Sequence, residues 1–348
     1  MKNASLLILL LPCLLACRKN NGSGPPVPAT ADVYAVGYIT SNSTTATVWK
    51  NGIASSLPNP VADPTTNTIA TAIATNGTDV YIAGYIFNTT NQYTALYWKN
   101  NIPVVLGPGQ ANSIAISGTD VYVGGTLDNQ LLAGYWKNGT RVSLTPTANE
   151  SLVHGIAVSG SDIYACGYVD SATNYLLTSY WKNNTSTPLQ PNPYGSVAWA
   201  ITLAGTDVYV AGEVTDPIAG FIDACYWKNG AVTIMQHNSI APSVARARAI
   251  AVNGSDIYLA GSIVTGAATN TQITPVYWEN TTPFVLDTTA LRIANTDAIA
   301  VNGTDVYVGG SGNPAHTSNV APVLWKNGQK TVLANASGNV SGVAVIRH

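Results

Sequence analysis

The sequence has 348 residues, of which 46% are hydrophobic and only 9% are charged, against roughly 25% charged residues in typical soluble domains. This composition excludes a disordered chain, and the formal net charge of -2 excludes the cationic surface that nucleic acids or anionic membranes would require. The 31 Gly, 18 Tyr and 8 Trp residues predict an all-β chain of short strands and tight turns.

The amino terminus has the pattern of a secretory signal. The apolar run from Leu6 to Ala16 is too short to span a bilayer, which needs about 20 residues, but it has the length of a signal-peptide core. The run ends in Leu14-Leu15-Ala16-Cys17, which resembles the lipobox of bacterial lipoproteins. The resemblance implies cleavage before Cys17, acylation of Cys17 and a palmitate-type anchor in the outer membrane, on its periplasmic or cell-surface face. A plain signal peptide that happens to contain a Cys is the alternative.

Three segments are therefore expected. Residues 1–16 form the signal peptide, residues 17–31 the lipidated Cys and a flexible tether containing Gly, Ser and Pro, and residues 32–348 the folded domain. The domain itself contains Cys166 and Cys225, for which two buried thiols are favoured and a disulfide is the alternative. No Cys or His spacing resembles a zinc site, so no metal or other cofactor is predicted.

One sequence unit recurs seven times in this domain. Its first marker is an Asp followed by Val or Ile and then Tyr, at intervals of 41 to 49 residues: Asp32, Asp79, Asp120, Asp162, Asp207, Asp256 and Asp305. Its second marker is a Trp, followed by Lys-Asn in every copy except the sixth, which has Glu279: Trp49, Trp98, Trp136, Trp181, Trp227, Trp278 and Trp325. Two short turns rich in Asn and Gly, which tolerate positive φ, divide each unit into four strands.

Repeats of this length with four strands are typical of β-propeller blades, so the predicted fold is an all-β, seven-bladed β-propeller with four-stranded blades. The first copy has no inner strand before Asp32, whereas the segment from Gly342 to Ile346 is an extra copy of that strand. The C-terminal strand is therefore expected to join blade 1 and close the ring. The repeat resembles those of secreted bacterial seven-bladed propellers and lipoproteins with Gly-x-Asp-Val-Tyr-Val-Ala-Gly and Tyr-Trp-Lys-Asn-Gly motifs. That resemblance implies the fold and no activity.

Most of the repeated residues are expected to be structural. The Tyr after each repeat Asp and the repeat Trp are interpreted as packing between blades, with hydrogen-bonded polar edges. Each repeat Asp is interpreted as a turn residue that accepts backbone N–H groups, rather than as a member of a carboxylate ring for metal or acid–base chemistry. The repeat Lys residues lie at the other short turn, on the same end of the blades, and could pair with these Asp residues.

The eighth residue before each repeat Asp differs in every copy. By contrast, the seventh residue before the Asp is always small (Ala, Ser or Gly), and the sixth is always Ile or Val. The eighth residues are Thr71, Asn112, His154, Trp199, Arg248, Asp297 and, by alignment of the terminal strand, Ser341. We place them at the start of each inner strand. The sixth residues after each Asp are expected to pair with them across the hairpin: Tyr38, Tyr85, Thr126, Tyr168, Glu213, Ser262 and Ser311.

Together these two sets predict a ligand-binding pocket at the mouth of the central channel, because a few convergent polar groups around an aromatic residue are what a small-molecule site requires. Solvated strand ends that are free to vary are the alternative. Trp199 favours a site, since it is the one Trp outside the repeat position. Secondary candidates, each more simply a solvated loop residue, are Tyr93, Asp128, Asp170, Tyr175, Tyr194, Asp216, Asp223, His237 and His316.

Three functions fit these features. The favoured one is a non-catalytic, monomeric binding or scaffold lipoprotein of the bacterial envelope, which holds a glycan, a peptide or a partner protein on the variable-loop face. The alternative is a polysaccharide lyase or glycoside hydrolase with His154 as base, Arg248 facing a substrate carboxylate, and Glu213 and Asp297 as paired carboxylates. No Gly-x-Ser-x-Gly or His-Glu-x-x-His motif supports catalysis. A structural spacer is the third possibility.

Overall fold

The computed structural model describes residues 31–348 except 62, 64, 91, 129–131, 146–149, 171–175, 190–195, 216–219, 238–243, 267–271 and 315–318. Of residues 170, 176, 292 and 293 it describes the backbone alone. The expected signal peptide, Cys17 and almost all of the tether lie outside the described residues. Within the described residues there are 27 strands and no helix, which confirms the all-β class. No described segment is therefore a helix that could span a membrane.

Consecutive strands pair antiparallel in groups of four, which we call units 1 to 7. Unit 1 contains β27 (Ser337–Arg347), β1 (Ala31–Thr40), β2 (Thr44–Lys50) and β3 (Ile53–Ser56). Unit 2 contains β4 (Asn67–Asn76), β5 (Asp79–Phe87), β6 (Tyr93–Lys99) and the first half of β7 (Ile102–Ser117). Unit 3 contains the second half of β7, β8 (Asp120–Leu127), β9 (Leu132–Lys137) and β10 (Thr140–Ser143).

The remaining units repeat this order. Unit 4 contains β11 (Ser151–Ser159), β12 (Asp162–Asp170), β13 (Leu176–Lys182) and β14 (Thr185–Pro188). Unit 5 contains β15 (Val197–Ala204), β16 (Asp207–Thr215), β17 (Ile222–Lys228) and β18 (Ala231–Ile234). Unit 6 contains β19 (Val244–Asn253), β20 (Asp256–Thr265), β21 (Gln272–Glu279) and β22 (Thr282–Val285). Unit 7 contains β23 (Leu291–Asn302), β24 (Asp305–Pro314), β25 (Ala321–Lys326) and β26 (Gln329–Val332).

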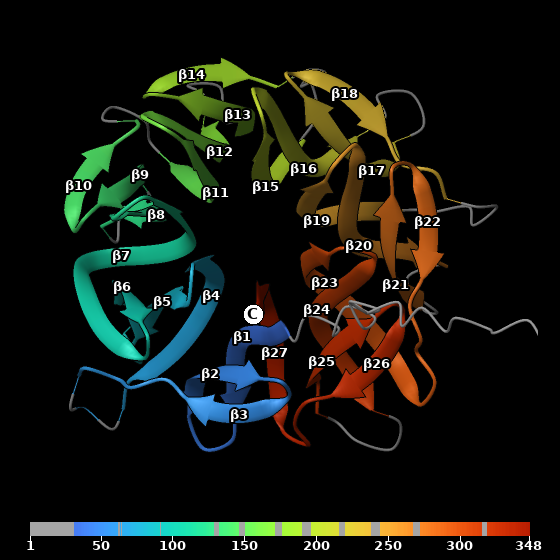
Figure 1. Cartoon of the computed structure of the whole chain (residues 1–348), viewed down its shortest axis with the longest axis horizontal. Coiled ribbons are helices and arrows are strands. Elements are labelled where there is room, and N and C mark those ends of the chain that lie inside the picture. The colour runs from blue at the N-terminus through green and yellow to red at the C-terminus, as the bar shows by residue number, and fades with distance from the viewer. Residues whose placement is uncertain are drawn as a thin grey trace, which may run out of the picture.

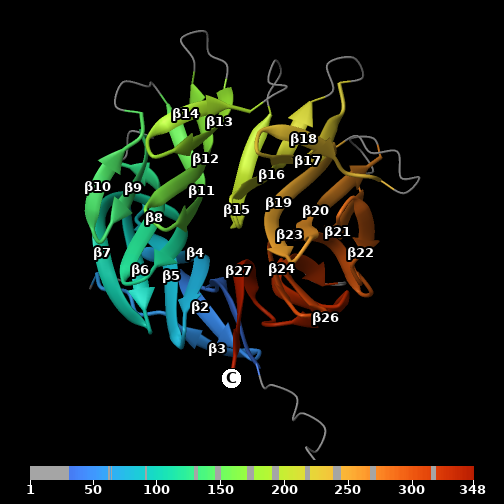
Figure 2. The same cartoon turned by 45° about the horizontal axis from the view of Figure 1, so that its top comes forward.

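The units stand radially around a central axis, which is the arrangement of a β-propeller (Figure 1). Strands such as β4, β11, β15, β19 and β23 lie nearest the axis, and β3, β10, β14, β18 and β22 lie at the periphery. In the tilted view the units stand upright around the same axis (Figure 2), although units 2 and 3 share β7 and one parallel pair, Ile222↔Val244, joins unit 5 to unit 6. Side chains that point inward from successive inner strands are therefore brought together although they are more than 40 residues apart in the sequence.

Both ends of the folded chain meet in unit 1. β27 pairs antiparallel with β1 from Asp32↔Ile346 at one end to Thr40↔Ser337 at the other. The last residue, His348, also contacts Asp32, with 3.0 Å between Nε2 and Oδ2. The C-terminal segment from Gly342 to Ile346, which resembles an inner strand in sequence, thus lies in β27 and provides the inner strand of unit 1.

The hydrophobic core lies between neighbouring units rather than within one sheet. Each repeat Trp is at most 1% exposed, and Trp98 of unit 2 packs in one cluster with Val36 and Val48 of unit 1. The expected hydrogen bond at the indole edge is present at Trp98, Trp278 and Trp325, whose Nε1 donates to backbone carbonyls. Trp49, Trp136 and Trp181 have no partner for Nε1 among the described residues, so that expectation holds for part of the set.

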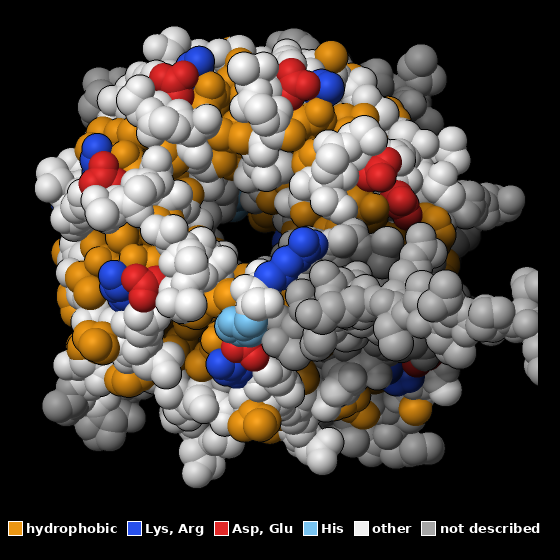
Figure 3. Space-filling view, viewed as in Figure 1, with side chains coloured by type: hydrophobic (Ala, Val, Ile, Leu, Met, Phe, Trp, Pro, Cys, Tyr) orange, Lys and Arg blue, Asp and Glu red, His pale blue; other side chains and the backbone are white. Residues whose placement is uncertain are grey.

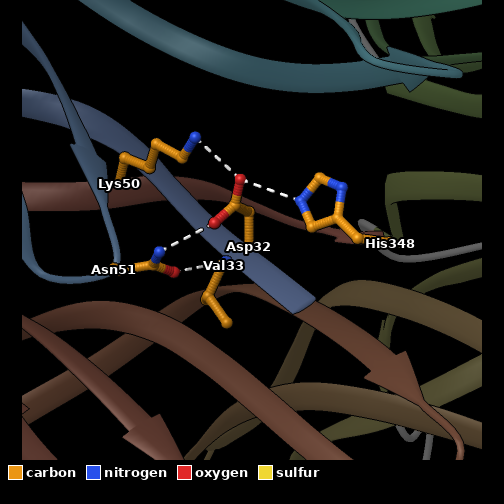
Figure 4. A network of polar contacts seen from close by, with 5 residues as sticks. All are labelled: Asp32, Val33, Lys50, Asn51 and His348. Carbon is orange, nitrogen blue, oxygen red and sulfur yellow. Dashed lines mark hydrogen bonds and ion pairs between the residues drawn. The ribbon is translucent and has the colours of Figure 1, made fainter. Parts of the chain in front are cut away.

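A cluster of polar side chains joins the two short turns of each unit through hydrogen bonds and ion pairs. In unit 1, Asn51 Nδ2 donates to Asp32 Oδ1, Asn51 Oδ1 accepts from the N–H of Val33, and Lys50 Nζ lies 2.7 Å from Asp32 Oδ2 (Figure 4). The backbone N–H is therefore satisfied by the Asn and not, as predicted, by the Asp. The reason is that Asn has both a donor and an acceptor and adopts positive φ in this turn, with φ of 52° at Asn51.

The same cluster recurs around one face of the molecule. Six Lys–Asp pairs have N···O distances of 2.7 to 3.1 Å, which confirms the expected pairing. Figure 3 shows acidic and basic side chains side by side around this face, which we call the Asp–Lys face. Hydrogen bonds from the Lys and Asn side chains hold the pKa of these Asp carboxyls below the usual value, for example at Asp79 and Asp207. In unit 6, Glu279 replaces the Lys and accepts a hydrogen bond from Tyr258.

Candidate functional site

Each of the seven variable inner-strand positions is the unpaired residue of a β-bulge. The register of the inner strand skips one residue in every unit, and the skipped residues are Thr71, Asn112, His154, Trp199, Arg248, Asp297 and Ser341. We call these the bulge residues. A β-bulge bends its strand and changes the direction of the extra side chain. The repeat therefore turns one side chain per unit toward the axis.

A glycine opposite each bulge makes this geometry possible. In unit 5 a Cβ on Gly212 would lie 2.0 Å from the carbonyl oxygen of Val197, and in unit 1 a Cβ on Gly37 would lie 1.8 Å from that of Asn339. The equivalent residue five positions after the repeat Asp is Gly in all seven units. This Gly permits the close backbone approach that the bulge requires, because it has no Cβ.

The bulges correct two details of the sequence-based prediction. The bulge residues lie inside the inner strands rather than at their start, since β4 already begins at Asn67, before Thr71. The sixth residue after the Asp does not pair with the bulge residue either: Tyr85 is opposite Ile69. Both errors have one cause, which is that an extra unpaired residue shifts the register of everything beyond it.

All seven bulge residues line one axial cavity of about 260 Å³. Beneath them, branched apolar side chains narrow the cavity: Ile73, Ile114, Ile156, Ile201, Ile250, Ile299 and Val343. The cavity thus has a polar ring next to an apolar ring. In the space-filling view an opening is visible at the centre of the disc (Figure 3).

Three bulge residues bind the next unit through hydrogen bonds of one kind. Thr71 Oγ1 donates to Ala111 O (2.8 Å), Asn112 Nδ2 donates to Val153 O (2.9 Å), and His154 Nδ1 lies 2.8 Å from Ala198 O. Each acceptor is the residue immediately before the bulge residue of the following unit. These side chains link neighbouring units, which is a structural role in addition to lining the cavity.

Trp199 forms the middle of a stack. The imidazole of His154 lies 4.5 Å from the Trp199 ring, and the guanidinium of Arg248 lies 4.3 Å from it. These partners come from the units on either side of unit 5, so the indole is packed against both neighbouring units. A cation over an indole face is favourable, and the stack orients Arg248. The indole therefore supports its neighbours and also lines the axial cavity.

Burial lowers the pKa of His154 to about 4, and the positive charge of Arg248 acts in the same direction, while the hydrogen bond to Ala198 opposes the shift. The imidazole is therefore neutral at neutral pH. Since its Nδ1 faces a carbonyl oxygen, Nδ1 carries the proton and Nε2 is the unprotonated nitrogen. A neutral imidazole with so low a pKa is a hydrogen-bond acceptor and a weak base.

Two carboxyl groups accompany this stack. Burial raises the pKa of Asp297, against the opposing effects of Arg248 and of the hydrogen bond from Asn339 Nδ2 (3.1 Å). Glu213 is 6% exposed, and burial also raises its pKa, against the opposing charges of Arg246 and Arg248. Arg246 Nε lies 2.9 Å from Glu213 Oε2.

A second and larger cavity, of about 690 Å³, lies beside the axis on units 6, 7 and 1. We call it the side cavity. Its polar lining consists of Tyr38, Thr40, Arg246, Arg248, Ser262, Asn295, Thr296, Asp297, Ser311, Ser337 and Asn339, and its apolar side chains include Val264, Ile273 and Val320. Two of the bulge residues, Arg248 and Asp297, border both cavities.

The predicted pocket is therefore divided. Of the residues six positions after the repeat Asp, Tyr38, Ser262 and Ser311 line the side cavity. The others line neither cavity themselves. Tyr85 packs against Phe87 and Tyr93. Tyr168 donates to Glu150 and its ring lies 5.9 Å from that of His154, which lines the axial cavity, and Glu213 pairs with Arg246 of the side cavity. Burial raises the pKa of Tyr85 to about 12. Thr126 is 1% exposed and lines neither cavity.

Sequence reasoning missed Arg246, Asn295 and Asn339. They occupy the tenth position before the repeat Asp, or its equivalent in β27, and pair across the hairpin with Ser262, Ser311 and Tyr38. In units 2 to 5 this position holds Ile69, Gln110, Leu152 and Val197. The change from mostly apolar to polar residues in three successive units was a readable signal, but recognising it required the shifted register.

The secondary candidates whose side chains the structure describes line neither cavity. Tyr93 contacts Tyr85, Asp128 forms a two-point ion pair with Arg141, and Asp223 lies 3.2 Å from His237. Tyr175, Tyr194, Asp216, His316 and the side chain of Asp170 lie outside the described residues. Cys166 and Cys225 are buried free thiols, as favoured, and burial raises the pKa of Cys166 to about 12. The described residues contain no group of three or more metal-ligating side chains.

No protein-family model matches the chain, and no curated protein matches it. Among solved structures, the acylaminoacyl peptidase of Pyrococcus horikoshii has 13% identity and a TM-score of 0.49, with 77% of this chain and 46% of the peptidase covered. The chain thus spans about half the length of that peptidase.

Two further structures cover most of both chains. The β-propeller domain of the Trilobed protease from Pyrococcus furiosus has 11% identity and a TM-score of 0.44, covering 76% of this chain and 83% of that domain. The periplasmic gluconolactonase of Pseudomonas aeruginosa has 11% identity and a TM-score of 0.45, covering 91% and 99%. At this level of similarity none of these proteins assigns an activity or a ligand to the chain.

Proposed function

We propose that this protein is a lipid-anchored binding protein of the bacterial outer membrane, which holds a glycan in the side cavity without catalysing a reaction. The observation that carries the proposal is the lining of that cavity. Amide, hydroxyl and guanidinium groups from three successive units converge there, next to a few apolar side chains. Oriented hydrogen-bond donors and acceptors in a concave site suit a ligand that is rich in hydroxyl groups.

We further propose that the seven units are the blades of a closed β-propeller. The antiparallel pairing of β27 with β1 supports closure, because it places the two ends of the domain in one sheet. A ring closed in this way would hold the three units around the side cavity in fixed positions. The cavity could then bind its ligand without first being ordered.

The proposed anchor rests on the sequence around Cys17, and the position of β1 gives it a direction. The tether would enter the domain at Asp32, on the Asp–Lys face, whereas Thr40 at the other end of β1 lines the side cavity. Eight residues of strand separate these points by about 26 Å. Metabolic labelling with palmitate tests the anchor: the wild type should incorporate label, and Cys17→Ser should abolish it while Cys166→Ser should retain it.

A glycan array followed by calorimetry tests the binding proposal. The purified domain should bind a subset of the array, and Asn295→Ala in the side cavity should weaken that binding by roughly tenfold, the equivalent of one lost hydrogen bond. Asn253→Ala is the matched control, since Asn253 lies at a short turn and donates to Gly303 O. Unchanged affinity in the Asn295 variant would place the site elsewhere.

A polysaccharide lyase or glycoside hydrolase is the second candidate. The observation that favours this candidate is that burial raises the pKa values of both Glu213 and Asp297, while the positive charge of Arg248 opposes the shift at both carboxyls. A raised carboxyl pKa is typical of a general acid. Purified protein incubated with neutral and uronate-containing polysaccharides should then release reducing ends or unsaturated products, and Asp297→Asn should abolish the release. Product release by the wild type that Asp297→Asn eliminates would replace the binding proposal.

A further inference from the structure

We propose that the ion pair between Glu213 and Arg246 determines which glycans the side cavity accepts. In this view Glu213 fixes Arg246 at the cavity wall and cancels its charge, so that the cavity selects uncharged, hydroxyl-rich glycans and rejects acidic ones. This inference rests on the proposed function and adds the ligand class to it.

The pair is a double exception to the repeat. Six positions after the repeat Asp, the other units have Tyr, Thr or Ser where unit 5 has Glu213. Ten positions before it, the other units have Ile, Gln, Leu, Val or Asn where unit 6 has Arg246. Two opposite charges therefore occur in neighbouring units at positions where the same fold forms elsewhere with uncharged side chains.

Stability does not explain the pair. Glu213 is 6% exposed, and burying a carboxylate and a guanidinium costs desolvation energy that the attraction between them seldom exceeds. An apolar or hydroxyl side chain, as in the other units, would avoid this cost. The two charges are consequently best explained by something that they do at the cavity.

The geometry places the Arg246 guanidinium for recognition. Its Nε is the atom that faces Glu213, at 2.9 Å, while the side chain lines the side cavity and is about one-third exposed. The contact is an ion pair without hydrogen-bond geometry, since Glu213 Oε2 has no hydrogen-bond partner among the described residues. It keeps the guanidinium at the cavity wall, where the five N–H donors of its rigid plane suit hydroxyl acceptors. Glu213 is thus a positioning residue, and Arg246 is the residue that would contact the ligand.

The charges around the cavity balance. Arg246 is paired with Glu213, at 2.9 Å, and the second guanidinium of the lining, Arg248, shares the cavity with the Asp297 carboxyl. The remaining polar groups, among them Asn295 and Asn339, are neutral. An acidic ligand would add an uncompensated negative charge to this balanced site and would lose its hydration there. An uncharged ligand with many hydroxyl groups would add none.

Calorimetry with two defined sets of probes tests the inference. The first set consists of neutral tetrasaccharides of glucose, galactose and mannose, and the second of tetrasaccharides of galacturonic and glucuronic acid. The wild-type protein is expected to bind at least one neutral probe about tenfold or more tighter than any acidic probe. Glu213→Gln should remove the charge balance and lower this preference by about tenfold or reverse it, with a salt dependence that appears for the acidic probes.

Two further variants complete the design. Glu213→Gln with Arg246→Gln restores neutrality, so it should recover the preference for neutral probes with weaker overall binding, and it also serves if the single variant does not fold. Glu279→Gln, on the Asp–Lys face, is the control that removes an acidic charge far from the cavity and should leave both affinities unchanged.

The outcomes separate this inference from the proposed function. A wild-type preference for acidic probes, or an unchanged preference in Glu213→Gln, overturns the inference while glycan binding itself stands. No binding of either probe set by the wild type overturns the proposed function and the inference with it.

Discussion

The Asp–Lys face, with six Lys–Asp pairs, and the seven bulge residues both arise from the repeat, yet they differ in kind. At the Asp–Lys face the same side chains make the same contacts in successive units, with one Glu in place of Lys. At the bulges the backbone geometry is repeated but the side chain differs in every unit. The comparison teaches that a repeated contact indicates a structural role, whereas a repeated backbone geometry with changing side chains gives its members different roles. Thr71, Asn112 and His154 link units, and Arg248 and Asp297 border the side cavity.

The largest expected effect compares two Trp residues of unit 5. Trp227 is a repeat residue with 0% exposure, and Trp227→Ala should destabilise the domain by about 3–5 kcal/mol through the cavity that it leaves. Trp199 is half-buried and lines the axial cavity, so Trp199→Ala should cost less than about 2 kcal/mol. Urea denaturation of both variants measures the difference, and equal losses would contradict the distinction between repeated and variable positions.

The second effect is a pH dependence of stability that arises from His154 in unit 4. The folded-state pKa of His154 is about 4, below the value of about 6.5 for an unfolded His, so the unfolded chain binds more protons between these values. The contribution of His154 to the free energy of unfolding is therefore complete above about pH 6.5. It is lost as the pH falls toward 4, and the loss is at most about 3 kcal/mol.

Denaturation curves from pH 7 to pH 4 measure this loss. His154→Gln should reduce it, whereas His348→Gln, at the Asp–Lys face, should retain it. The same pH dependence in wild type and His154→Gln would show that another group is responsible.

The third effect tests whether the bulge needs its glycine. Gly212→Ala would place a Cβ 2.0 Å from Val197 O, so the hairpin must shift, at a cost of about 1–3 kcal/mol. The shift should also move the neighbouring Trp199 and change its fluorescence. Thr206→Ala, an exposed turn substitution in the same unit, is the control with little expected effect. Wild-type stability of Gly212→Ala would refute the steric explanation.

The smallest effect concerns the links between units. Thr71→Val keeps the shape of the side chain but removes the hydrogen bond to Ala111 O, and we expect a loss of about 1 kcal/mol. Thr75→Val, on the same strand but away from the bulge, is the comparison. If the two substitutions cost the same, the bulge residues of units 2 to 4 do not stabilise the contacts between units through these bonds.

Much of the fold was predictable because it is encoded locally and repeatedly. The all-β class, the turns around Asn and Gly, and the buried Trp residues follow from patterns within one unit. The last strand of the chain could be assigned to unit 1 because it repeats the inner-strand sequence but no Asp-containing strand follows it, whereas the first Asp-containing strand has no inner strand before it. The bulge could not be read in this way, since it inserts one residue into a pairing whose other features stay the same. The Gly that permits the bulge, five residues after each repeat Asp, cannot be distinguished in the sequence from a Gly that is needed for a turn.

The sequence by itself determined the period of the chain, its strand-forming segments and the positions at which the units differ. Tertiary structure alone decided what those differences form: a stack of His154, Trp199 and Arg248 at the axis and a separate polar cavity beside it. The physical reason is that strand and turn preferences act between near neighbours in the chain. A cavity depends on the register of each hairpin and on side chains that come from different units and are more than 40 residues apart in the sequence.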